Sequence, residues 1–345
     1  MNYEQSETDP QGSAQPPGWN RRTYATWILI AVNLLVWIAM EANGGSEDPE
    51  VLLDFGAMFG PFIAGGEYWR LFTAMFLHAG SMHLIFNGLG LLIFGKITER
   101  IFGLYRFVII YVLAGLAGST ASFAFNDAVI GAGASGAIMG ILGAVAAFYF
   151  IRRNTLGDGG RQNFKGLLFI TGIILILGFT ISGIDNWAHM GGLAGGFVVG
   201  MVLAPNYQRV SDGFFGNSFR IVDTNSLYKR WWVVPLALVV LVAGVRVAMA
   251  RASDEAQAYS HVMQAERLLD EQEYEEALEE ISFAFELDML NGYTYYVRGK
   301  IMAEQGNTPQ AIRDFGSSLR LGLDSESKSD AIRTLINLRS ERRGY

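Results

Sequence analysis

Cysteine is absent from the 345 residues, and histidine occurs only four times. The absence of cysteine excludes disulfides, thiolate zinc sites and cysteine nucleophiles. Any histidine chemistry must use His78, His83, His189 or His261. Charge is scarce as well, because charged residues make up 17% of the chain, against roughly 25% in ordinary soluble domains. With 51% hydrophobic residues, this balance indicates a membrane protein.

The chain contains several long apolar stretches that carry few charged residues. A transmembrane helix needs about 20 largely apolar residues, and seven stretches qualify, near 24–42, 82–101, 106–126, 133–152, 164–183, 187–204 and 232–250. Lys and Arg are concentrated in every second loop between these stretches, and loops rich in Lys and Arg lie on the cytoplasmic side. This predicts a cytoplasmic N-terminus and an extracytoplasmic C-terminus. The expected class is an all-α, polytopic protein of the cell membrane.

Four polar side chains are expected at one depth. His83 and Asn87 lie four residues apart, on one face early in the second span. Ser135 begins the fourth span and His189 begins the sixth. These spans enter from the outer side, so their first turns lie near the outer surface. Polar groups in hydrocarbon are costly, so the cluster marks a functional site.

Glycine is concentrated around this cluster. The stretch GAGASGAIMG at 131–140 contains a G-x-G-x-x-G pattern. A dinucleotide site also needs a preceding strand and an acidic residue about 20 positions later, which this context does not provide. Small residues at four-residue spacing instead form stripes for close helix packing, at Gly136 and Gly140 and at Gly192, Gly196 and Gly200. This packing would bring Ser135 to His189.

The cluster has the groups needed for acyl transfer. Ser135 needs an adjacent base to become a nucleophile, and His189 is the expected base. His83, Asn87 and the backbone N–H of Ser135 are the expected oxyanion donors. No carboxylate is obviously placed to orient His189, which favours a Ser–His dyad over a triad.

The same residues resemble the rhomboid family of intramembrane serine proteases over roughly residues 23–205. The segment YWRLFTAMFLHAGSMHLIFN at 68–87 carries a W-R pair and an H-x-x-x-N pair. GASG at 133–136 resembles the G-x-S-G nucleophile motif, and AHMGGLAGG at 188–196 resembles A-H-x-x-G-x-x-x-G. The supporting motif residues are Trp69, Arg70, Gly133, Gly136, Gly192 and Gly196.

The resemblance implies a compact six-helix fold with a water-filled cavity and a long first loop at 43–80. It implies a serine endopeptidase that cuts transmembrane segments of other proteins near the outer surface, without a cofactor or metal. One departure is Met139, where some members have a tyrosine stacked on the base. Met can also pack on an imidazole.

Simpler interpretations accompany these assignments. Ser135 alone would be a packing residue, and a catalytically silent rhomboid-like protein would bind transmembrane segments without cutting them. A transporter ranks last, because the inner halves of the fourth and sixth spans carry almost no polar residues. Trp69 and Arg70 are expected to anchor and tie the first loop, and Glu99 and Arg100 to end a helix near the cytoplasmic headgroups.

The C-terminal residues 252–345 are acidic and repetitive. Ala277 and Ala311 are 34 residues apart, as are Ile281 and Phe315, and this period is typical of tetratricopeptide repeats. The implied partner is a protein or peptide, and the alternative is an acidic helical domain without a partner. The acidic balance argues against nucleic acid.

The predicted organisation has five parts. These are a disordered cytoplasmic N-terminus at 1–22, the six-helix rhomboid domain at 23–205, a cytoplasmic linker at 206–231, a seventh transmembrane helix at 232–251 and the helical repeat domain at 252–345.

Overall fold

A computed structural model describes residues 22–126, 129–181, 183–211 and 219–343. Almost all of the predicted disordered segment 1–22 therefore lies outside the described residues. The chain divides into two compact units. The first comprises Met1–Ala57, Leu71–Phe125 and Gly131–Val245, and the second comprises Met58–Arg70, Asn126–Ile130 and Arg246–Tyr345.

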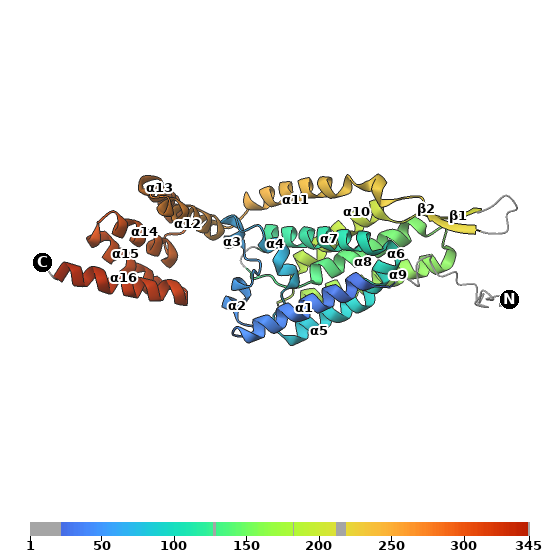
Figure 1. Ribbon diagram of the computed structural model, residues 1–345, viewed down its shortest axis with the longest axis horizontal. Helices are drawn as coiled ribbons and strands as arrows, with labels where there is room; N and C mark the ends of the chain where they lie inside the picture. The colour runs from blue at the N-terminus through green and yellow to red at the C-terminus, as the bar shows by residue number, and fades with distance from the viewer. Residues whose placement is uncertain (1–21, 127–128, 182, 212–218, 344–345) are drawn as a thin grey trace. The chain divides into compact units, whose positions relative to one another are not determined.

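The first unit is a bundle of long helices joined by short ones (Figure 1). The long helices are α1 (Tyr24–Ala42), α7 (Leu104–Phe125), α8 (Ser135–Arg152), α9 (Gly157–Thr180), α10 (Asn186–Leu203) and α11 (Val233–Met249). A further span is continuous in three pieces, α5 (Ser81–Gly90), the π-helical turn η2 (Leu91–Gly95) and α6 (Lys96–Phe102). The short elements are α2 (Pro49–Asp54), α4 (Arg70–Thr73), η1 (Ala74–Phe76) and η3 (Leu227–Arg230). The first residue of α4, Arg70, still belongs to the second unit, and its other residues belong to the first.

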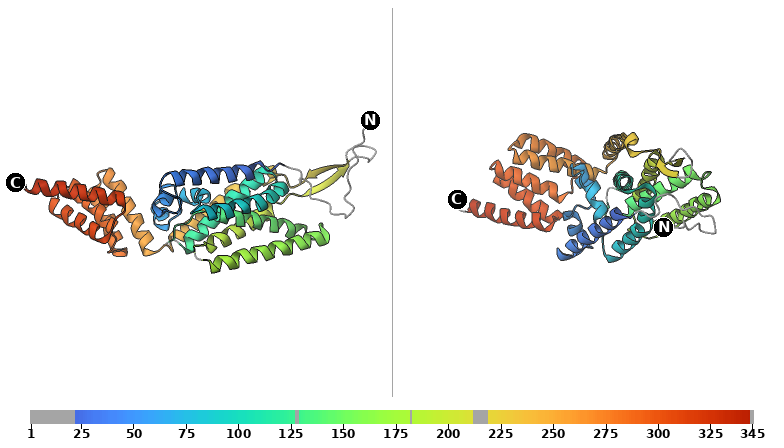
Figure 2. Two further views of the ribbon diagram at one scale, coloured as in Figure 1. Left: turned by 90° about the horizontal axis from the view of Figure 1, so that it is seen from below. Right: turned by 45° about the vertical axis from the view of Figure 1, so that its right-hand side comes forward.

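Helix α8 is the centre of this bundle. Fourteen of its residues, from Gly136 to Tyr149, are buried, and it packs mainly against α10 and α7. Helix α9 lies at the periphery of the bundle (Figure 2). Only 11% of its most apolar 18-residue stretch is buried. A central helix whose first residue is Ser135 places that residue at the end of a rigid, enclosed element.

Six helices in the described residues are long and apolar enough to cross a membrane. They correspond to six of the seven predicted spans, and the protein is an all-helical, polytopic membrane protein with one small hairpin. The predicted span 187–204 is not among the six. It forms the 18-residue helix α10, whose five glycines together with Asn186 and His189 make it less apolar than the others.

Glu99 was predicted to lie near the cytoplasmic headgroups, whereas the structure buries it inside the protein. Its side chain is buried, and its carboxylate accepts hydrogen bonds from the backbone N–H groups of Ala25 and Thr26 at 2.9 Å and from Thr26 Oγ1 at 2.7 Å. The first turn of a helix carries unpaired N–H groups and a partial positive charge. Glu99 therefore caps α1 from another helix, which the local sequence around Glu99 does not reveal.

The predicted linker 206–231 contains a hairpin that the sequence analysis did not anticipate. Strand β1 (Tyr207–Ser211) pairs antiparallel with β2 (Phe219–Asp223), with Tyr207 opposite Asp223. Asp223 also forms an ion pair with Arg106 of α7 at 2.6 Å. The ion pair ties the hairpin to the bundle, and both strands are too short for a strong sequence signal.

The second unit contains α3 (Gly60–Ala64) and five helices of the C-terminal region. These are α12 (Asp254–Asp270), α13 (Tyr274–Leu287), α14 (Gly292–Glu304), α15 (Thr308–Leu321) and α16 (Ser325–Arg343). Their core includes Ala277 and Ala311, and Ile281 and Phe315, all at most 1% exposed. Helix α15 begins 34 residues after α13, in agreement with the predicted period, and the tetratricopeptide assignment itself stays a prediction.

Candidate active site

Gly133 brings three elements of the first unit together. Its N–H donates to the carbonyl of Ala74 at 2.8 Å, and its φ is +129°, which favours glycine. A Cβ at this position would lie 2.7 Å from Cε1 and Nε2 of His83 and 3.8 Å from Ser135 Oγ. The His83 ring thus fills the space beside Gly133, and the Ser135 hydroxyl borders the same space.

Ser135 is the first residue of α8 and is half-buried. The N–H groups of a helix's first turn have no partner within the helix. The backbone N–H of Ser135 is one of these groups, so it is available in principle to a developing negative charge next to its own hydroxyl.

Helices α8 and α10 approach at their backbones. A Cβ on Gly192 would lie 2.0 Å from the Gly136 carbonyl oxygen, and one on Gly196 would lie 1.9 Å from that of Gly140. No side chain larger than hydrogen fits these positions without moving a backbone. The two glycine stripes are therefore in direct contact.

The same packing brings the ends of the two helices together. A Cβ on Gly136 would lie 3.2 Å from the carbonyl oxygen of Ala188. Gly136 follows Ser135 and Ala188 precedes His189, so the two candidate catalytic residues sit on adjoining first turns. His189 is 7% exposed, and its Nδ1 has no hydrogen-bond partner within the described part of the chain.

Asp185 is occupied by other groups. Its carboxylate accepts from the Ala188 N–H at 2.9 Å, which caps α10, and also from Ser122 Oγ. These contacts orient the helix that carries His189. In the part of the chain that the structure describes, Asp185 forms no hydrogen bond with the His189 ring itself.

His83 and Asn87 share a face of α5, as their spacing predicts. Asn87 is buried, and its Nδ2 donates to the His83 carbonyl at 3.0 Å. The amide of Asn87 therefore bonds within its own helix in this structure, and an oxyanion role requires it to turn.

The structure places His78, at the end of the first loop, beside His83. The two rings are 5.2 Å apart and meet edge to face at 66°. Burial, with His83 as the second cause, lowers the pKa of His78 to about 3. His78 is therefore neutral at physiological pH. The five-residue spacing of the two histidines was the only sequence signal for this contact.

Trp69 and Arg70 lie in the second unit. Arg70 is buried, its Nε donates to Glu67 Oε2 at 2.7 Å, and its guanidinium lies over the rings of Phe62 and Trp69 at 4.5 and 4.6 Å. Arg70 thus contacts three other residues of this part of the first loop. Trp69 is 49% exposed.

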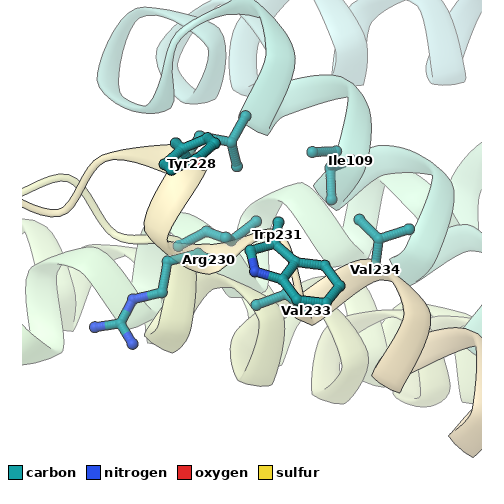
Figure 3. Close-up of a pocket in the computed structure, with 8 residues that line it drawn as sticks. Ile109, Tyr228, Arg230, Trp231, Val233 and Val234 are labelled. Atoms are coloured by element: carbon teal, nitrogen blue, oxygen red, sulfur yellow. The ribbon is translucent and has the colours of Figure 1, made fainter.

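The first unit also has an apolar pocket of about 350 Å³ at the opposite end of α10 (Figure 3). It is lined by Ile109, Leu203, Val233 and Trp231 among others, and the Arg230 guanidinium points away from Ile109. Leu203 is 14 residues after His189, which is roughly 21 Å along a helix. The pocket is separate from the cluster around Ser135.

Part of this chain is similar to known proteins. A family model described as "Rhomboid domain" matches residues 65–206. The "RHOMBOID-like protein 6, mitochondrial" of Arabidopsis thaliana is 34% identical over 208 residues, which are 60% of this chain and 67% of that protein. The "Putative rhomboid protease YdcA" of Bacillus subtilis is 34% identical over 148 residues, 43% of this chain and 73% of that protein. The chain belongs to the rhomboid family.

Another rhomboid relative is matched over a smaller part of its length. The "Rhomboid protease GluP" of Bacillus subtilis is 42% identical over 188 residues, which are 53% of this chain and 36% of that protein. This chain therefore spans only about a third of the length of that relative. The C-terminal helices α12–α16 lie beyond the matched family region.

Proposed function

We propose that this protein is an intramembrane serine endopeptidase that cuts transmembrane segments of membrane proteins near the outer face. The observation that carries the proposal is the contact between Gly136 and the Ala188 carbonyl, which sets Ser135 and His189 on adjoining helix turns. The names of two relatives as rhomboid proteases support the same activity.

In the proposed reaction, Ser135 Oγ attacks the carbonyl carbon of the scissile peptide bond while His189 takes the hydroxyl proton. The C–N bond then breaks, and His189 returns the proton to the leaving amine. A water molecule, deprotonated by His189, attacks the acyl-enzyme and releases the new carboxylate and the serine. No cofactor or metal takes part in these steps.

The tetrahedral intermediate carries a negative oxygen that needs hydrogen-bond donors. We assign these to the Ser135 N–H, the His83 ring and the Asn87 amide. The His83 ring borders the same space beside Gly133 as the Ser135 hydroxyl. Loss of one such donor typically raises the barrier by about 2.7–4 kcal/mol. Gly133 and Gly136, with Gly192 and Gly196, support the site by allowing the helices to approach.

The proposed orientation rests on the distribution of Lys and Arg, with a cytoplasmic N-terminus and an extracytoplasmic C-terminus. Residues 252–345 would then face the outside, where we propose that they bind a protein or peptide partner. The substrates are proposed by chemical class only, as transmembrane helices of other proteins.

Labelling with a fluorophosphonate probe tests the nucleophile. The purified full chain should label at Ser135, and Ser135→Ala should abolish labelling and cleavage of a transmembrane substrate. Ser81→Ala removes an exposed serine of the same unit and should leave labelling unchanged. Equal labelling of wild type and Ser135→Ala would refute the protease proposal.

The second candidate is a catalytically silent rhomboid-like protein that binds transmembrane segments. One observation favours it: in the described structure, Ser135 Oγ and the His189 ring form no hydrogen bond with each other. Catalytic bonds of this kind often tighten only when substrate binds, so we place this candidate second. His189→Ala separates the two, because it should abolish cleavage only if His189 is the base.

A further inference from the structure

Segment 58–70 of the first loop packs within the second unit, against the first helix of the C-terminal region. Figure 1 shows α3 beside α12, and the two helices are in contact. Ala64 of α3 is buried in one cluster with Ala252 and Ala256. Helix α3 ends directly before the family-matched region, which begins at residue 65, so residues of the C-terminal region hold the chain where that match begins.

Polar and aromatic contacts make this interface specific. The Arg267 guanidinium donates to the Gly65 carbonyl at 3.0 Å, which is a charge-assisted hydrogen bond. Phe62 meets Tyr259 edge to face at 5.2 Å. The Tyr68 hydroxyl contacts Met249 Sδ at 3.5 Å.

Two glycines leave room for α12. A Cβ on Gly65 would lie 3.0 Å from Met263 Cγ, and one on Gly66 would lie 3.3 Å from Arg267 Nη2. Gly66 also has a φ of +99°, which favours glycine. The loop backbone is thus shaped to receive Met263 and Arg267.

The ends of this segment continue directly into the region of the candidate active site. Thr73 Oγ1 donates to the Gly56 carbonyl at 2.7 Å, which closes the base of the loop. The next residue, Ala74, accepts the Gly133 N–H, and Gly133 borders His83 and Ser135. Segment 58–70 is therefore joined to the residue that binds Gly133 by a short stretch of chain, the five residues from Arg70 to Ala74.

We infer that α12 holds segment 58–70 of the first loop, and that Arg267 and Met263 are positioning residues for the Ser135 site. The catalytic part of this inference rests on the proposed function. By holding segment 58–70, the C-terminal helices control the activity of the rhomboid domain. A partner that binds these helices and shifts α12 would change that activity.

A disulfide tests the interface without any enzyme assay. A Cβ on Gly65 would lie 3.4 Å from Met263 Cβ, close to the separation of about 3.5–4.5 Å found in disulfides. The chain has no cysteine, so Gly65→Cys with Met263→Cys can form only one internal bond. Mild oxidation of the full chain in detergent should link the two peptides, as seen by mass spectrometry. The control pair is Gly65→Cys with Gln264→Cys, since Gln264 is exposed on the next position of α12.

The catalytic consequence is tested through Arg267. Arg267→Gln should slow fluorophosphonate labelling of Ser135 and lower kcat by about tenfold, the size expected for losing one hydrogen bond to a charged group. Arg267→Lys keeps a cationic donor and should restore most of the rate. Arg320→Gln changes an exposed arginine of α15 and should have no effect. A purely structural role of Arg267 in the C-terminal region would not alter the labelling rate of Ser135.

The outcomes separate the two proposals. Cross-linking no better than in the control pair overturns the interface, whatever the enzyme does. Cross-linking with an unchanged Arg267→Gln labelling rate overturns the positioning role. If wild type itself does not label at Ser135, the proposed function fails and the positioning role fails with it, while the cross-link still decides whether α12 holds the loop.

Discussion

In the first unit the closest contacts between helix backbones are made at glycines, whereas the small residues buried among the C-terminal helices are mostly alanine. Gly192 and Gly196 of α10 lie against the backbone of α8. In the C-terminal helices the fully buried small residues include Ala258, Ala265, Ala277, Ala284, Ala311 and Ala331. Helices in lipid gain little from burying apolar surface, so close backbone approach stabilises their packing. Helices in water gain from apolar burial, and alanine adds a methyl group to that core.

The surfaces of the two units differ in the same sense. Long helices of the first unit expose large apolar side chains, among them Leu35, Phe86, Phe169 and Ile176, each at least 64% exposed. Helices α12 and α15 instead turn polar faces outward. The comparison teaches that one substitution, glycine to alanine, should have opposite effects at Gly196, where two helix backbones of the first unit meet, and at Gly316 of the second unit, where an added methyl group meets nothing.

The largest effect is expected for Gly196→Ala. Its methyl group would lie 1.9 Å from the Gly140 carbonyl oxygen, and this neighbour is backbone that cannot turn aside. Overpacking usually costs about 1–3 kcal/mol and sometimes more, and we expect the upper end together with loss of Ser135 labelling. Thermal unfolding of the full chain in detergent measures the effect. Gly172→Ala in α9, with nothing within 4 Å, is the matched control, and equal stability of the two variants would contradict the packing argument.

A smaller effect is expected from a buried charge in the second unit. Asp314 is 2% exposed and accepts from Arg298 Nε at 2.9 Å and Nη2 at 2.7 Å. Arg298→Met keeps the contact with Phe285 but leaves the carboxylate without its cation, which should cost about 3 kcal/mol. Hydrogen exchange of α14 and α15 amides measures this loss. Arg320→Met on exposed α15 should be nearly neutral, and a similarly small effect for Arg298→Met would show that water or Gln310 suffices for Asp314.

The smallest effect, and the opposite sign, is expected for Gly316→Ala. Gly316 lies inside α15, and its added Cβ would meet nothing within 4 Å. Replacing a helical glycine by alanine stabilises by about 0.5–1 kcal/mol where no clash results. Slower hydrogen exchange along α15 is the expected result. Faster exchange would remove the contrast with Gly196→Ala.

Several features of the candidate site could be predicted from patterns in the sequence. The four-residue spacing of the glycines predicts which faces of α8 and α10 meet, and charge bias with span counting places Ser135 and His189 at similar depths. The helix α10 was predicted as a span, although its glycines make it less apolar than the six helices that qualify by composition. The contact of His78 with His83 was not predicted, because loop positions have no periodicity that fixes a direction.

By itself, the sequence determined that this chain is helical, that it crosses a membrane and which polar residues lie near one depth. Lipid leaves no partner for free backbone groups, so long apolar stretches must be helices. Only the tertiary structure decided the partners of the buried polar groups. Glu99 caps α1 across 73 residues, and Arg267 bonds Gly65 across 202. Such pairs depend on how distant segments approach in space, which local composition and spacing do not encode.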